Sequence, residues 1–211
     1  VNFYKTSATL QETSFRVKPK ITENRAFAEH VNGILGSLHQ HMKLQQYKDE
    51  KFIPEVSEFN TVMEELRLTF PADLTTAVPT LLLKHNDIFI DQRNAAWITK
   101  QAFQLASMAS EAGIVLPFSV ENFLVCYKSE VFALLDWTTT QLYTNRQIDA
   151  AVAQQQVVDL ANLLISVVDY KDAASDEAKK NSRLWNFMQE ATDGAFLSAA
   201  DATLALGSIL T

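Results

Sequence analysis

The chain has 211 residues, with 47 % hydrophobic and 20 % charged residues and a formal net charge of −7. This composition is typical of a folded globular protein and excludes a chain that is disordered throughout. Only five glycines and five prolines occur, which disfavours a sandwich or barrel with its many tight turns. We therefore expect an all-α protein.

The first 22 residues lack helical periodicity. Phe15, Val17 and Pro19 alternate along the chain, and Pro19 disfavours a helical conformation at Lys18. This pattern predicts an extended N-terminal arm or edge strand over residues 1–22, followed by a helical domain over residues 23–211.

The predicted arm is basic, whereas the rest of the chain is acidic. The first 25 residues contain five basic and two acidic residues, a net charge of +3, which leaves −10 for the remainder. Such an arm can pack back on its own domain as a loosely held terminus, pair along a neighbouring chain, or dock on nucleic acid. The candidate interaction residues are the aromatic and basic ones of the arm: Phe3, Tyr4, Phe15, Arg16, Lys18 and Lys20.

Three helices are expected in the first half of the domain. The first runs from Thr22 to about Tyr47, with apolar residues every three or four positions. A second follows Pro54 and stops at Pro71, because Val56, Phe59, Val62, Met63 and Leu66 fit a helical stripe. A third carries Ala95, Ile98, Ala102, Leu105 and Ala109, and Gly113 marks its C-terminal stop.

Four further helices are expected toward the C-terminus. One starts at Ser119 and reaches Trp137, and the next opens at Asn145 and is broadly apolar. The last two cover residues 175–194 and about 198–210. The sequence thus predicts a multi-helix bundle of about seven helices with an extended N-terminal arm.

Sequence signatures of catalysis are missing. There is no phosphate-binding glycine loop, no nucleophile elbow and no His-Glu-x-x-His pair. On one predicted helix, His30 and His41 share a face but lie about 16 Å apart, too far to ligate one ion. Cys126 sits in an apolar stretch that is typical of a buried, inert thiol. We therefore assign no catalytic, cofactor-binding or metal-ligating residue, expect no cofactor, and favour a protein that is not an enzyme.

The apolar runs are too short for a membrane span of about 18–20 residues. No Asn-x-Ser/Thr sequon occurs, which agrees with a soluble, intracellular protein, although the sequence does not identify the compartment.

Three functions are compatible with these features. The first is a non-enzymatic structural or assembly subunit whose basic aromatic arm docks on the acidic helical body of a neighbour, either a protein partner or a second copy. The second is a helical enzyme or small-ligand carrier with a pocket between helices. The third is a nucleic-acid-coating protein resembling a viral coat subunit, which the acidic charge disfavours.

Overall fold

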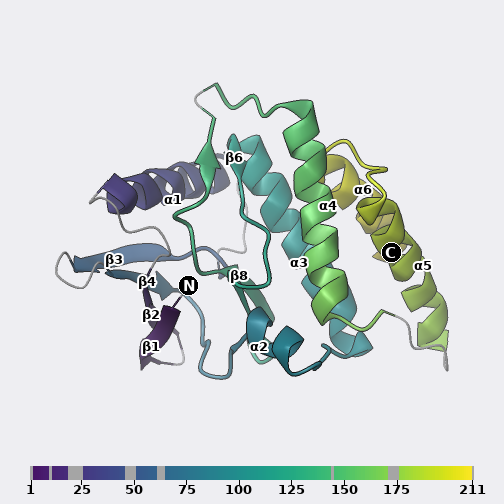
Figure 1. Ribbon diagram of the computed structural model, residues 1–211, viewed down its shortest axis with the longest axis horizontal. Coiled ribbons are helices and arrows are strands. Elements are labelled where there is room, and N and C mark those ends of the chain that lie inside the picture. Colours follow the sequence, from purple (N-terminus) through teal and green to yellow (C-terminus); the bar gives the residue numbers. More distant parts are fainter. Residues whose placement is uncertain are drawn as a thin grey trace.

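In the computed structural model, the described residues are 2–9, 11–18, 26–45, 51–60, 65–143, 145–170 and 176–210. They form six helices and three antiparallel sheets, so the expectation of an all-α bundle of about seven helices is wrong. The protein has a mixed α/β fold in which a sheet-containing layer stands beside a mainly helical body (Figure 1).

The N-terminal layer is a four-stranded sheet with one helix. Its strands are β1 (Asn2–Ala8), β2 (Thr13–Lys18), β3 (Glu55–Asn60) and β4 (Glu65–Phe70), in the order β1-β2-β4-β3. Helix α1 (Ala26–Gln45) follows β2 in the chain and contacts β3. The outer strands are therefore β1 and β3.

The predicted N-terminal arm is not a free extension. Residues 2–8 and 13–18 form a hairpin, and β2 also pairs with β4, so that Phe15 lies opposite Leu68. Phe15 and Val17 are buried in the core. The alternation of apolar residues arises because one face of β2 packs inward.

The helical body follows a connector at residues 71–77. Its helices are α2 (Thr80–His85), α3 (Gln92–Glu111), α4 (Ala150–Val167), α5 (Asp176–Thr192) and α6 (Ala199–Leu210). Its strands are β5 (Val78–Pro79), β6 (Ile114–Val115), β7 (Phe123–Cys126), β8 (Val131–Leu134) and β9 (Gln141–Leu142). They form one three-stranded sheet, β5-β7-β8, and one two-stranded sheet, β6-β9.

Two predicted helices are strands. In the stretch predicted as the second helix, residues 55–60 form β3 and residues 65–70 form β4, whereas the predicted Val62 and Met63 lie outside the described residues. Strand β4 buries Leu66, Leu68 and Phe70 at alternate positions. The stretch after Ser119 becomes the hairpin β7–β8, where all eight strand residues are buried. A strand buried on both faces shows no alternation and resembles a buried helix in sequence.

Helix α3 lies at the centre of the body. It contacts α1, α4, α6, β6 and β8, and its buried stripe includes the predicted Ala95, Ile98, Ala102, Leu105 and Ala109. Its predicted C-terminal stop is confirmed, since the helix ends at Glu111 and Gly113 follows with φ +77°.

Helix α4 is, among the described helices, the one long and apolar enough to cross a membrane. This is weak evidence for a span, because seven of its residues are buried in the core and a core helix passes the same test.

Candidate functional site

Four large apolar residues of the body are exposed on α2 and in the turn after it. Leu81, Leu82, Ile88 and Phe89 are exposed by 44 %, 50 %, 54 % and 53 % although they are large and apolar. These four residues are called the apolar α2 surface below. Exposed apolar side chains gathered in one place, rather than scattered singly, mark sites of interaction.

Local backbone geometry places Ile88 and Phe89 outside. At the end of α2 the Ile88 N–H donates to the Leu83 carbonyl over 2.9 Å, and the Asp87 N–H donates to the Lys84 carbonyl over 3.3 Å. Asp87 has φ +51°, so this is a Schellman cap with aspartate in the left-handed position that glycine usually takes. The cap turns the chain so that Leu83 is buried while its apolar neighbours face solvent.

A hollow of about 270 Å³ adjoins the apolar α2 surface. Phe89 forms one wall, and the others come from the C-terminal end of α4 and from α5; the lining residues are Phe89, Ile165, Val168, Asp169, Tyr170 and Trp185. The Tyr170 hydroxyl lies 2.7 Å from the Thr99 hydroxyl, which fixes this wall to α3. Burial raises the pKa of Tyr170 well above its usual value, so the ring is neutral.

Five of the six predicted interaction residues belong to the strands of the N-terminal hairpin. Phe15 is buried and packs edge-to-face on Phe70, so it is a core residue. Arg16 is half-buried and lies 4.0 Å from the Glu65 carboxylate, and Lys18 is exposed. Phe3 and Tyr4 belong to β1, but their side chains lie outside the described part of the structure, as does Lys20 altogether.

The hairpin is fastened to the connector. The buried Thr13 hydroxyl donates to the Ala72 carbonyl over 2.9 Å and accepts from the Leu74 N–H over 2.8 Å. The Lys5 ammonium reaches the Thr75 carbonyl over 3.1 Å. The connector thus runs past the turn end of the hairpin.

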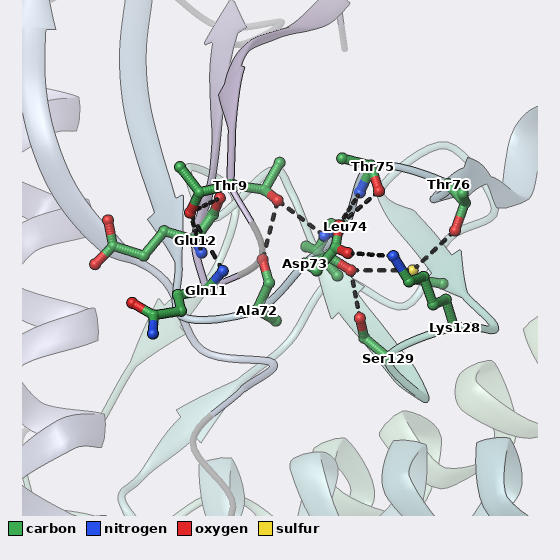
Figure 2. A network of polar contacts seen from close by, with 12 residues as sticks. Thr9, Gln11, Glu12, Ala72, Asp73, Leu74, Thr75, Thr76, Lys128 and Ser129 are labelled. Atoms are coloured by element: carbon green, nitrogen blue, oxygen red, sulfur yellow. Dashed lines mark hydrogen bonds and ion pairs between the residues drawn. The ribbon is translucent and has the colours of Figure 1, made fainter.

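The connector is also fastened to the body. Figure 2 shows Asp73 between Thr75 and the β7–β8 turn, with Lys128 donating to its carboxylate over 2.7 Å. Ser129 donates to the Asp73 carbonyl from the same turn. The hydrogen bond from Lys128, with those from Thr75, holds the pKa of Asp73 well below its usual range, and the pKa of Lys128 is raised by the same bond.

A polar cavity of about 590 Å³ opens beside this network. It lies between the hairpin tip, the connector and the β7–β8 turn, and its lining residues are Gln11, Lys51, Pro71, Ala72, Asp73, Tyr127, Lys128, Ser129 and Glu130. Its charged groups are two lysines and two carboxylates, of which Lys128 and Asp73 neutralise each other.

The histidines of α1 have structural partners. His30 donates to the Thr140 carbonyl over 2.8 Å, His39 lies 3.1 Å from the Pro54 carbonyl, and His41 lies 3.1 Å from the Glu111 carboxylate. They tie α1 to neighbouring elements. Within the described residues, no three His, Cys, Asp or Glu side chains are grouped so that they could hold a metal ion.

Comparison with known proteins does not assign this chain to a family. No family model matches it, and no curated protein matches its sequence.

Sequence reasoning missed the apolar α2 surface. The sequence shows two apolar runs, Thr-Leu-Leu-Leu at residues 80–83 and Ile-Phe-Ile at residues 88–90. It does not show which of their side chains face outward, because that depends on the packing of Leu83 and Ile90 in the core. The available signal was that a six-residue helix buries only part of its circumference, so three consecutive leucines cannot all point inward.

Proposed function

We propose that this protein is a non-enzymatic structural or assembly subunit that acts through protein–protein contacts. The observation that carries the proposal is the apolar α2 surface, where four large apolar side chains are each about half exposed within nine consecutive residues. Covering such a surface removes apolar area from water, which is the main favourable term in association.

The basic N-terminal hairpin is the second contact of this proposal. Lys5 and Lys18 are exposed on it, whereas residues 80–211 contain 15 acidic and nine basic residues, a net charge of −6. The hairpin of one subunit docks on the acidic helical body of its neighbour, where opposite charges steer the encounter. Nucleic acid is not the partner proposed, because a body of net charge −6 repels phosphates.

The test is the mass of the full chain in solution, followed by light scattering over a concentration series. Assembly predicts a mass that rises with concentration above the 23.7 kDa of one chain. A monomer at every concentration contradicts the proposal. Removal of residues 1–22 is unsuitable here, because it deletes Phe15 and Val17 from the core.

Charge reversal tests the hairpin instead. The variant Lys18→Glu is expected to weaken association at low salt, and the loss is expected to shrink at high salt because exposed charges are screened. The matched control is Lys43→Glu, which makes the same change of net charge at an exposed position on α1. Equal effects of the two variants would contradict a specific role of the hairpin.

A small-ligand carrier is the second candidate, favoured by the polar cavity of about 590 Å³. This volume falls within the usual range for ligand pockets, about 300–1,000 Å³. Lys51 and Glu130 offer a cation and an anion to a polar ligand there. If this candidate is correct, succinate or a free amino acid raises the melting temperature and Lys51→Ala removes the increase. No shift with such probes contradicts it.

A further inference from the structure

We infer that the hollow beside Phe89 binds a compact quaternary ammonium compound, whose trimethylammonium group is held by aromatic rings and by one acidic residue. This inference goes beyond the proposed function, because it concerns a small ligand and not a protein contact. It does not depend on what covers the apolar α2 surface.

Three of the six described lining residues of the hollow are aromatic. Phe89 follows α2, Tyr170 follows α4, and Trp185 belongs to α5. The centroids of the Tyr170 and Trp185 rings lie 6.5 Å apart, and their planes are inclined by 35°. The face of an aromatic ring is electron-rich and attracts a cation that lies within about 6 Å of its centroid. Rings from three separate segments therefore provide a site that favours positive charge.

The one charged residue among the described lining residues is acidic. It is Asp169, and its backbone N–H donates to the Ile90 carbonyl over 2.9 Å, which holds Asp169 beside the segment that carries Phe89. A negative charge in this wall attracts a cation and repels an anion. A neutral apolar ligand would remove water from the acidic group without compensation, which costs free energy. The charge of the wall thus agrees with the preference of the rings.

The other two lining residues favour an alkylated cation. Ile165 and Val168 offer apolar contacts and no side-chain hydrogen-bond acceptor. A primary ammonium group has three N–H donors that would lose water here, whereas a quaternary ammonium group has none. The volume of about 270 Å³ lies just below the usual range for drug-sized ligands, about 300–1,000 Å³. A small compound with a trimethylammonium group meets both conditions.

The first experiment is a calorimetric titration of the full chain with choline and with its neutral isostere, in which a tert-butyl group replaces the trimethylammonium group. The two probes have the same shape, but only choline is charged. Choline is expected to bind at least about tenfold more tightly, because only a cation interacts with the ring faces and with the acidic wall. Equal affinities of the two probes, or no binding of choline at millimolar concentrations, would overturn the inference.

The second experiment assigns the binding to the rings of the hollow. Trp185→Leu keeps an apolar side chain but removes the ring, and it is expected to raise the dissociation constant of choline at least about tenfold. The matched control is Trp97→Leu, which makes the same change at a half-buried tryptophan outside the described lining. Urea unfolding checks that both variants are folded. A folded Trp185→Leu that binds choline as the wild type does contradicts the inference.

The third experiment tests the charge of the wall. Asp169→Asn is expected to weaken the binding of choline several-fold and to leave that of the neutral isostere unchanged, a difference that a loss of packing alone would not produce. The control is Asp159→Asn, which removes the same charge from an exposed position on α4. If the two variants weaken choline equally, Asp169 has no specific role and the inference fails in this part.

The trimethylammonium group also occurs in the head group of phosphatidylcholine. We assign the site to a free compound, since the hollow has room for one small molecule. Sedimentation with phosphatidylcholine vesicles is therefore expected to leave the protein in solution. Binding to the vesicles without binding of free choline would contradict a free ligand. The proposed function is tested separately by the mass in solution, so the failure of one is distinguishable from the failure of the other.

Discussion

The Lys128 ammonium lies 2.7 Å from the Asp73 carboxylate, which joins the β7–β8 turn of the helical body to the connector from the sheet. Asp73 is one of the buried acidic residues, and its other carboxylate oxygen accepts from the backbone and side chain of Thr75. One side chain thus links the two parts of the molecule.

This link predicts that stability depends on acidity. The pKa of Asp73 is lower in the folded protein than its usual value near 4, so the unfolded chain binds the proton more tightly. The stabilising contribution is therefore complete above about pH 4 and is lost as the pH falls through the lowered pKa. Urea unfolding between pH 7 and pH 2 measures it.

The control for this prediction is Asp73→Asn, which cannot ionise. We expect a smaller fall in the free energy of unfolding below pH 4 in the variant than in the wild type. If the two proteins lose stability in parallel, the ion pair with Lys128 does not contribute to the acid sensitivity.

Gly113 is predicted to tolerate no side chain. Its φ is +77°, and a Cβ atom there would stand 2.7 Å from the Arg146 Cα and 3.0 Å from the Tyr143 carbonyl oxygen. Gly113→Ala is expected to lower the free energy of unfolding by roughly 1–3 kcal/mol, as judged from the cost of such strained backbone. The matched control, Gly36→Ala in α1, meets nothing within 4 Å and is expected to stabilise by up to about 1 kcal/mol. Denaturant unfolding measures the free energy of unfolding of the two variants, and similar values for both would contradict the prediction for Gly113.

Asp87 is predicted to be a suboptimal cap. It occupies the left-handed position after α2, with φ +51°, which costs a residue with a Cβ roughly 1–2 kcal/mol. Asp87→Gly is expected to raise the free energy of unfolding by about 1 kcal/mol, since part of the gain is lost to glycine's greater freedom in the unfolded chain. Asp87→Ala removes the same charge but keeps the strain, so it is expected to give no such gain. Thermal unfolding of dilute samples distinguishes them.

Thr13 is predicted to stabilise the fold through its hydroxyl group. Its side chain is fully buried and bonds both Ala72 and Leu74 of the connector. Thr13→Val keeps the shape but leaves a buried carbonyl and a buried N–H without partners, at an expected cost of about 1–3 kcal/mol. Thr139→Val changes an exposed threonine and is expected to be nearly neutral. Equal unfolding free energies for the two variants would contradict the role of this hydroxyl.

The sequence correctly predicts those helices whose buried residues lie on one face. For α1, Val31, Ile34, Leu35 and Leu38 recur with helical spacing, and all four are buried in the observed helix. Helix α3 was likewise predictable together with its stop at Gly113, because that stop is a local backbone property.

Elements that depend on distant partners were not predicted. Leu66, Leu68 and Phe70 alternate in the sequence as they do in a strand. However, Leu66 also continues a pattern of helical spacing that begins at Val56, so the sequence fits both structures. Pairing with β2 makes this segment the strand β4. Hairpin β7–β8 gave no alternation at all, because both of its faces are covered. The apolar α2 surface depends on tertiary packing in the same way.

The position of β2 between β1 and β4 has a consequence for synthesis on the ribosome. Strand β2 has its local partner at once, but β4 begins only at Glu65, after α1 and β3 have been made. Synthesis proceeds at about 5–20 residues per second, so β4 follows β2 by a time on the order of seconds. Until then the second edge of β2 has no partner strand, and Phe15 and Val17 are not yet packed in the core. During that interval a chaperone or another polypeptide can bind the exposed apolar strand, and pairing of β4 with β2 ends this exposure.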